Sequence, residues 1–294
     1  MTSIHMEYAF ELLRALPFTA AEMEQLHDAA KALPWEELAP LVEKLQRPLE
    51  AEKAKDGFYA LIGEIDQQHH GLAGMCVFAA AMYGNAKRLY SLGISKEILL
   101  HTCSCLHFMS EKYREQFGVF GFDRGFWIWR QASGIIVRLG SLEYEYIPAL
   151  SEQMAGYAGL KAGEPVLSIH IPTGTDLSRE ALDASYAQAH AFYREHPELC
   201  FAGKQPQAIV CHTWLLSPTL RTFLGESSGI RRFAEDFRLC HVDETGDGYK
   251  YFLYLAGKEV PLEDLPERTS LQRAVKKHVL AGGKIGEAFG VLEK

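Results

Sequence analysis

Two histidines stand near the ends of short apolar segments and are the first candidates for chemistry. His170 lies in Pro165–Ile171 and His212 lies in Ala208–Trp214, and both segments are typical of short buried strands. Histidine is the usual general base near neutral pH, and burial among apolar neighbours would lower the pKa of its imidazole and keep it neutral. Ligands bind at the carboxyl ends of parallel strands, so either histidine could act on a substrate. The alternative for each is a structural histidine hydrogen-bonded to the backbone.

Further candidates lie beside these histidines. Glu143 and Glu145 alternate along the segment Leu142–Ile147, so their carboxylates share one strand face, where they could act as a base or only be solvated. Cys211 precedes His212, but neighbours on a strand point to opposite faces and cannot form a nucleophile–base pair by themselves. A hydrolase that uses Cys211 or a histidine pair is therefore a weaker alternative, and a small buried apolar side chain also explains the cysteine.

The segment Pro172–Ser178, after the first histidine-bearing strand, has features of an anion site. Ser178 is expected to be the N-cap of a helix, and a helix N-terminus offers unpaired N–H groups and a partial positive charge that suit phosphate. Thr173, Gly174 and Thr175 add two hydroxyls and a close backbone approach. Because a helix needs a cap whether or not phosphate binds, capping alone is the alternative.

Neither a metal site nor a disulfide framework is indicated. The chain has six cysteines without a CxxC pair. A group of histidines and cysteines alternates every two residues, which on a helix spreads the side chains around the axis; its members are His101, Cys103, Cys105 and His107. We therefore expect no metal, and buried reduced thiols in a cytoplasmic protein.

The elements that must position these residues begin with a helical half. Thr19–Glu22 has the pattern of a capping box, and Ser95 is the expected N-cap of a helix that Gly118 ends. The aromatic, glycine-punctuated segment Phe120–Trp129 could line an acceptor pocket or only pack between domains. The pattern predicts an all-helical domain over residues 1–132.

The period then changes to that of strands. The turn Gly140-Ser141 predicts an antiparallel hairpin. The two histidine-bearing strands follow, with the helix from Ser178 between them. A second hairpin and a closing helix from Thr269-Ser270 complete the order, and the arms of the two hairpins are Gly134–Leu139 with Leu142–Ile147 and Leu239–Asp243 with Tyr249–Leu255. Residues 133–294 are thus predicted to form a mixed α+β sheet with flanking helices.

The composition of the chain excludes several classes of protein. Its 294 residues include 48% hydrophobic and 23% charged residues, which argues against a disordered or fibrous chain. The formal net charge is −8 and no basic patch is evident, so we expect no nucleic-acid partner. No apolar run reaches the roughly 18–20 residues that span a bilayer, and the N-terminus lacks a signal-peptide pattern, so we expect a cytoplasmic protein without a membrane partner.

The order of elements from Gly134 onward resembles the C-terminal domain of GNAT-like acyltransferases. The phrases Ser168-Ile-His-Ile-Pro172 and Cys211-His-Thr-Trp-Leu-Leu216 carry this resemblance, which is greatest to the bacterial family with a helical acyltransferase N-terminal domain and a GNAT-like C-terminal domain. It implies that an acyl-CoA or acetyl-CoA thioester lies between two splayed central strands.

The resemblance also assigns roles to residues. It implies that Ile169 and Ile171 border the pantetheine, that the helix from Ser178 faces the pyrophosphate, and that an acidic residue in the region of Glu143 and Glu145 serves as base. The acyl group would pass to an amine of a small molecule or peptide.

Two departures from the family pattern leave a second hypothesis open. The segment Pro172–Ser178 has a single glycine and the acidic Asp176 where the family has an Arg/Gln-x-x-Gly-x-Gly/Ala loop, and the segment Gly229–Phe237 has phenylalanines where the family has a tyrosine acid. The first hypothesis is an acyl-CoA-dependent N-acyltransferase. The alternative is a non-catalytic ligand-binding or scaffolding protein on a degenerate GNAT-like fold, and either protein could form a homodimer.

Overall fold

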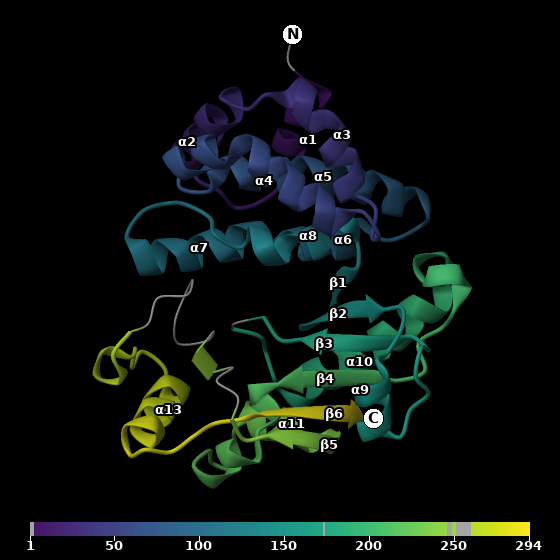
Figure 1. The fold of residues 1–294 in the computed structure, drawn as a ribbon, viewed down its shortest axis with the longest axis vertical. Coiled ribbons are helices and arrows are strands. Elements are labelled where there is room, and N and C mark those ends of the chain that lie inside the picture. The colour runs from purple at the N-terminus through teal and green to yellow at the C-terminus, as the bar shows by residue number, and fades with distance from the viewer. Residues whose placement is uncertain (1–2, 173, 246–248, 251–259) are drawn as a thin grey trace. The chain divides into compact units, whose positions relative to one another are not determined.

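The computed structural model describes residues 3–172, 174–245, 249–250 and 260–294 (Figure 1). The chain divides into two compact units, Met1–Arg138 and Leu139–Lys294. Each unit has a hydrophobic core of its own.

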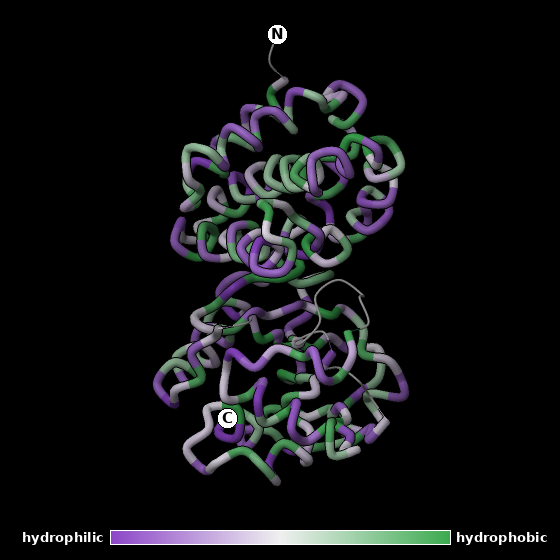
Figure 2. Tube along the Cα trace, turned by 90° about the vertical axis from the view of Figure 1, so that its left-hand side faces the viewer, coloured by the Kyte–Doolittle hydropathy of each residue, from purple (hydrophilic) through white to green (hydrophobic). Residues whose placement is uncertain are grey.

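The first unit is a set of α-helices arranged around one buried helix, α5. Its described helices are α1 (Ile4–Leu13), α2 (Ala20–Lys31), α3 (Trp35–Leu45), α4 (Ala51–Gln68), α5 (Leu72–Ser91), α6 (Lys96–Cys103), α7 (Cys105–Phe117) and α8 (Gly125–Ser133). Four consecutive residues of α5, Met75 to Phe78, are fully buried, which is typical of a helix enclosed on all sides. Hydrophobic and hydrophilic residues alternate along many of the surrounding helices, as expected for helices with one buried side (Figure 2).

Local capping positions the starts of these helices as predicted. The Thr19 hydroxyl accepts a hydrogen bond from the backbone N–H of Glu22 at 3.3 Å, and the Glu22 carboxylate accepts one from the N–H of Thr19 at 2.6 Å. This reciprocal pair confirms the capping box. Ser95 caps α6 by accepting from the N–H of Ile98.

The single helix predicted between Ser95 and Gly118 is wrong, because the segment forms the two helices α6 and α7. Ser104 separates them, and its hydroxyl donates to the carbonyl of His101 at 2.6 Å. Side-chain hydroxyls that bond to the backbone in this way compete with the regular helix pattern. Gly118 ends α7 as expected.

The second half of the aromatic segment Phe120–Trp129 begins the helix α8. A Cβ atom at Gly125 would lie 1.8 Å from the Tyr59 hydroxyl oxygen. This glycine therefore permits close packing of α8 against α4, and it does not mark a turn.

The second unit is built on a mixed sheet in the order β1-β2-β3-β4-β6-β5, whose strand β1 begins three residues before the unit does. The strands are β1 (Ile136–Leu139), β2 (Leu142–Ile147), β3 (Val166–His170), β4 (Ile209–Thr213), β5 (Phe237–Asp243) and β6 (Glu287–Leu292). Gly140 takes a positive φ of 63° in the turn between β1 and β2, which confirms the predicted first hairpin. Strands β3 and β4 are parallel, whereas β2–β3, β4–β6 and β5–β6 are antiparallel, so the mixed α+β class is confirmed.

Helices cover both faces of this sheet (Figure 1). The described helices that do so are α9 (Glu152–Ala158), α10 (Arg179–Glu195) and α11 (Gly229–Glu235). Helix α13 (Ser270–Leu280) lies beside the sheet and packs in a separate buried cluster with Trp214 and Leu220. The described 3-10 turns are η1 (Pro197–Leu199), η2 (Phe201–Gly203), η3 (Trp214–Leu216), η4 (Pro218–Thr222) and η5 (Leu262–Asp264). On one face, the Tyr144 hydroxyl of β2 lies 3.0 Å from the Ser185 hydroxyl of α10. On the other face, Ala155 of α9 belongs to the same buried cluster as Val166 and Val210.

The predicted second hairpin is contradicted where its second arm was expected to begin, because Tyr249 is not in a strand. Strand β5 pairs with β6, in a register from Phe237↔Leu292 to Asp243↔Glu287, and β6 lies between β4 and β5. Tyr249 is helical, and residues 251–255 of the expected second arm lie outside the described residues. The final strand comes about forty residues after β5, so no short-range turn signal indicates the pairing.

The two central parallel strands are paired over only part of their length. The register between β3 and β4 runs from Leu167↔Ile209 to Ser168↔Val210. Each strand remains paired on its other side as far as His170 and Thr213, while the described residues after Ser168 and Val210 are not paired with each other. The sheet therefore opens between β3 and β4 at their carboxyl ends.

Candidate active site

A pocket of about 900 Å³ lies where β3 and β4 separate. Its walls come from the end of β3 and the segment before α10, from the end of β4 and the turn after it, and from the segments around α11 and α13; the lining residues are 169–172, 174–178, 212–215, 223–225, 227–230, 232, 270, 271 and 274. A crevice at the carboxyl ends of parallel strands is a common ligand site.

The pocket joins an apolar wall to a polar end. The large apolar side chains come from η3, from the end of η4 and from α13; they are Trp214, Leu215, Phe223 and Leu271. The polar end is formed by the start of α10, where Ser178 accepts a hydrogen bond from the N–H of Ala181 at 3.3 Å and confirms the predicted N-cap. A lining of this kind suits a ligand with a long apolar part and a polar part.

The polar segment before α10 is held by its own side chains. The Asp176 carboxylate accepts a hydrogen bond from the N–H of Ser178 at 2.8 Å, and the Thr175 hydroxyl donates to the carbonyl of Pro172 at 2.6 Å. Gly174 has a positive φ of 82°. Gly174, Thr175 and Ser178 line the pocket, whereas the predicted Thr173 lies outside the described residues.

His170 lines the pocket and contacts a carboxylate. Its Nε2 lies 2.7 Å from Oε2 of Glu145, and the two side chains are 25% and 18% exposed. Residues facing each other across an antiparallel pair share a sheet face, and His170 lies opposite Glu143 in the register. A carboxylate in this position orients the imidazole and stabilises the charge that it gains when it accepts a proton.

His212 lines the same pocket but differs from His170 in exposure. Its side chain is 48% exposed, so the expected burial of this histidine is wrong. Its Nε2 lies 3.7 Å from Oε2 of Glu287, and its ring meets that of Phe289 at a centroid distance of 6.2 Å. Both contacts come from β6, so they depend on the strand that the sequence pattern did not reveal.

Three of the predicted residues, Cys211, Glu143 and Glu145, do not line the pocket. Cys211 is fully buried, its Sγ donates to the carbonyl of Ile169 at 3.5 Å, and burial raises the pKa of its thiol. A thiol held neutral in this way is a poor nucleophile. Glu143 is 5% exposed, and Glu145 contacts His170, which lines the pocket. Ile169 and Ile171, the residues expected to border a pantetheine, do line the pocket.

The described residues contain no group of three or more histidine, cysteine or carboxylate side chains that could hold a metal ion. None of the described helices combines the length and hydropathy needed to cross a membrane.

Family comparisons agree with this geometry. The model for a GNAT-like C-terminal domain matches residues 136–292, and the model for an N-acyltransferase N-terminal domain matches residues 6–134. This chain belongs to the N-acyltransferases with a GNAT-like C-terminal domain. The two family models together account for both units. A comparison with curated proteins found no match.

Solved acyltransferase structures are similar to this N-acyltransferase in fold. A complex with decanoyl-CoA has a TM-score of 0.71 at 24% identity, over 97% of this chain and 87% of the other. A complex with decanoyl-CoA and teicoplanin has a TM-score of 0.66 at 23% identity, over 97% and 98% of the two chains. A mutant in complex with octanoyl-CoA has a TM-score of 0.64 at 23% identity, over 97% and 99% of the two chains.

Two residues near the pocket of this N-acyltransferase carry no individual signal in the sequence. Glu287 is the partner of His212 but belongs to the unpredicted strand β6. Arg232 lines the pocket from α11, and in the sequence it is one of two adjacent arginines on a short helix. The short run of residues 288–292, which contains no polar side chain, would have indicated a buried strand at β6, but the identity of its pairing partner is non-local.

Proposed function

We propose that this N-acyltransferase binds an acyl-CoA in the pocket between β3 and β4 and transfers its acyl group to an amine, with His170 as general base. The observation that carries the proposal is the loss of β3–β4 pairing after Ser168 and Val210, at the mouth of a pocket that His170 lines. Backbone N–H and C=O groups that are not paired across this gap are available to the amide groups of a pantetheine.

The pocket supports this donor in two further ways. Its apolar wall offers burial to a medium-length acyl chain or to the pantetheine methyl groups. Its polar end lies at the N-terminus of α10, where N–H groups favour a phosphate. The similar structures that contain decanoyl-CoA and octanoyl-CoA make these two thioesters the first donors to test.

In the proposed reaction the amine nitrogen attacks the carbonyl carbon of the thioester. The new N–C bond forms, the C–S bond breaks, and CoA leaves as a thiolate that takes a proton from solvent, to which the imidazolium of His170 later returns the proton of the amine. His170 takes the proton that the amine loses, and the Glu145 carboxylate at 2.7 Å stabilises the resulting imidazolium. We favour His170 over His212 because it is less exposed and its carboxylate is closer, at 2.7 Å against 3.7 Å.

The acceptor that we propose is an amine on a peptide or small molecule. Teicoplanin is present in one of the similar structures, so an amine-bearing glycopeptide is the first acceptor to try. A simple primary amine at high concentration provides a test that does not depend on acceptor recognition.

Calorimetry with decanoyl-CoA and steady-state release of the CoA thiol test the proposal. We expect the wild-type protein to bind decanoyl-CoA and His170→Ala to bind it equally well while losing most of its kcat, because a general base contributes roughly 10²–10⁴-fold. The matched control is His190→Ala, since His190 is an exposed histidine on α10 that does not line the pocket. Failure of the wild-type protein to bind any acyl-CoA at millimolar concentration would refute the donor, and an unchanged kcat in His170→Ala would refute the base.

A further inference from the structure

The pocket of this N-acyltransferase has an acidic residue where a phosphate-binding loop would be expected. Asp176 is the titratable residue of the segment before α10, and the described residues of that segment include no lysine or arginine. A diphosphate carries negative charge that a helix N-terminus alone offsets only in part. A cation from another element is therefore needed if an acyl-CoA is to bind tightly here.

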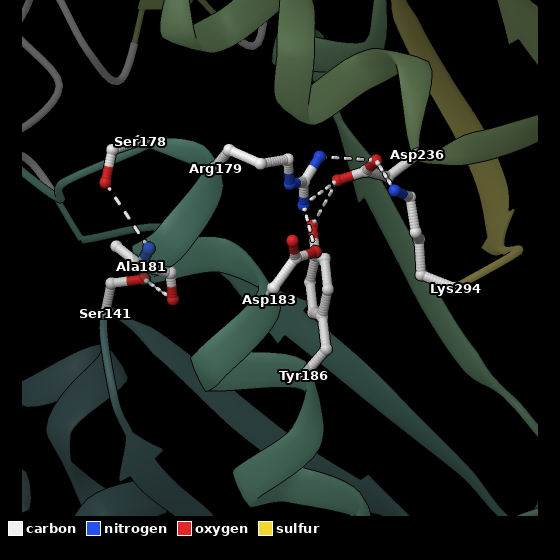
Figure 3. A network of polar contacts seen from close by, with 8 residues as sticks. All are labelled: Ser141, Ser178, Arg179, Ala181, Asp183, Tyr186, Asp236 and Lys294. Atoms are coloured by element: carbon white, nitrogen blue, oxygen red, sulfur yellow. Dashed lines mark hydrogen bonds and ion pairs between the residues drawn. The ribbon is translucent and has the colours of Figure 1, made fainter.

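The cation nearest in sequence is already occupied. Arg179, the first residue of α10, makes two hydrogen bonds to the carboxylate of Asp236 at 2.8 and 2.9 Å and an ion pair with Asp183 at 2.8 Å (Figure 3). Asp236 is buried and also accepts from the Tyr186 hydroxyl at 3.1 Å. Arg179 does not line the pocket, and removing it from Asp236 would leave a buried carboxylate with reduced compensation.

Arg232 is different, because it lines the pocket and has no ion-pair partner among the residues that the structure describes. It is the only lysine or arginine among the described residues of the pocket wall. Its Nε is buried without a hydrogen-bond partner, and within the described part of the chain its guanidinium makes no ion pair. Its neighbour Arg231 on the same helix is paired with Glu235 at 3.3 Å.

The packing of α11 directs Arg232 toward the start of α10. A Cβ atom at Gly229, the first residue of α11, would lie 2.9 Å from the Cβ of Leu177, which directly precedes the N-cap Ser178. Arg232 follows Gly229 by three residues and therefore lies on the same side of α11. The unpaired guanidinium and the segment 174–178 thus belong to walls of one pocket that approach each other closely.

We infer that Arg232 binds the diphosphate of the acyl-CoA and supplies the charge that the missing glycine-rich loop does not provide. This inference rests on the proposed acyl-CoA site and adds a specific ligand to it. A guanidinium presents several N–H donors in a planar fork that matches phosphate oxygens, and one whose Nε is buried without a partner gains more from such a ligand than a fully solvated one.

Three donors separate this role from others: decanoyl-CoA, 3′-dephospho-decanoyl-CoA and decanoyl-pantetheine, which lacks the diphosphate. We expect Arg232→Met to weaken binding of the first two roughly 10- to 100-fold, as for a charge-assisted hydrogen bond, and to leave decanoyl-pantetheine unchanged. Arg232→Lys should recover part of the loss, and Arg231→Met should bind all three donors like the wild-type protein.

Several results would overturn the inference. Unchanged binding of decanoyl-CoA by Arg232→Met would do so, as would an equal loss for decanoyl-pantetheine, which would indicate a structural role. A loss seen with decanoyl-CoA but not with the 3′-dephospho donor would assign Arg232 to the 3′-phosphate instead. Because the wild-type protein is measured first, failure of the acyl-CoA site itself is distinguished from failure of the Arg232 assignment.

Discussion

The contact between Glu145 and His170 leads to a quantitative prediction. Glu145→Gln keeps the length of the side chain and removes its charge, so the hydrogen bond at 2.7 Å can persist while the stabilisation of an imidazolium is lost. A hydrogen bond to a charged partner contributes about 1.5–3 kcal/mol. Because the two side chains are 25% and 18% exposed, the lower part of that range applies. At about 1.4 kcal/mol for each tenfold change, kcat should fall roughly 10- to 30-fold.

The assay is the initial rate of CoA thiol release at saturating decanoyl-CoA and amine, with donor affinity measured separately. The loss should appear in kcat and not in the affinity for decanoyl-CoA, because the carboxylate does not line the pocket. Glu164→Gln is a surface control, since Glu164 pairs with Lys204 away from the site. Glu287→Gln is the comparison that tests which histidine is the base.

The reasoning is refuted if Glu145→Gln retains kcat within about twofold, a change smaller than one charge-assisted hydrogen bond would cause. It is also refuted if Glu287→Gln loses kcat while Glu145→Gln does not. That second result would transfer the role of base to His212.

Three further predictions concern stability and reactivity. Burial raises the pKa of the Asp123 carboxyl, and the charge of Arg124 opposes this shift. The contribution of Asp123 to the free energy of unfolding is therefore greatest below the unfolded pKa of about 3.9, and it is lost as the pH rises through the folded pKa. Asp123→Asn should therefore have a higher Tm than the wild-type protein at pH 7, with the difference vanishing near pH 4, and a difference independent of pH would contradict this account. Arg179→Met should lower the free energy of unfolding by about 2–3 kcal/mol in urea titrations, because Asp236 is buried but keeps Tyr186 and Lys294 as partners. A loss no larger than that of Arg194→Met, an exposed control on the same helix, would show that the pair contributes little. Cys211→Ala should keep the wild-type kcat. Iodoacetamide at pH 8 should label Cys211 only after unfolding, because burial raises the pKa of this thiol. Abolished turnover of Cys211→Ala at an unchanged Tm would restore Cys211 as a nucleophile.

Features set by neighbours in the chain could be predicted from the sequence. The capping box at Thr19, the N-cap at Ser178 and the turn at Gly140 each depend on hydrogen bonds or φ angles within a few residues, and the structure contains all three. The first hairpin and the two central strands follow from alternation and apolar runs of ordinary length. The break at Ser104 was missed because a single side-chain hydrogen bond within a helical pattern leaves its period unchanged.

Only those residues of the candidate site that belong to recognisable local segments could be predicted. The pattern of the two central strands and the next helix led to His170, Gly174 and His212, and the family resemblance led to Ile169; in the structure these four residues line one pocket. The exposure of His212 was not predictable, because a strand pattern does not reveal what covers the strand. The partner of each histidine is likewise a property of strand order.

The sequence by itself determined the class of the fold, the order of most elements and the location of the pocket at the ends of β3 and β4. Only the tertiary structure decided that β6 enters between β4 and β5 and brings Glu287 to His212, that Glu145 meets His170, and that Arg232 remains unpaired in the pocket wall. The physical reason is the separation along the chain of the residues that make each contact. Caps and turns are settled by atoms a few residues apart, whereas strand insertion and the pairing of charges depend on the packing of segments that are far apart along the chain.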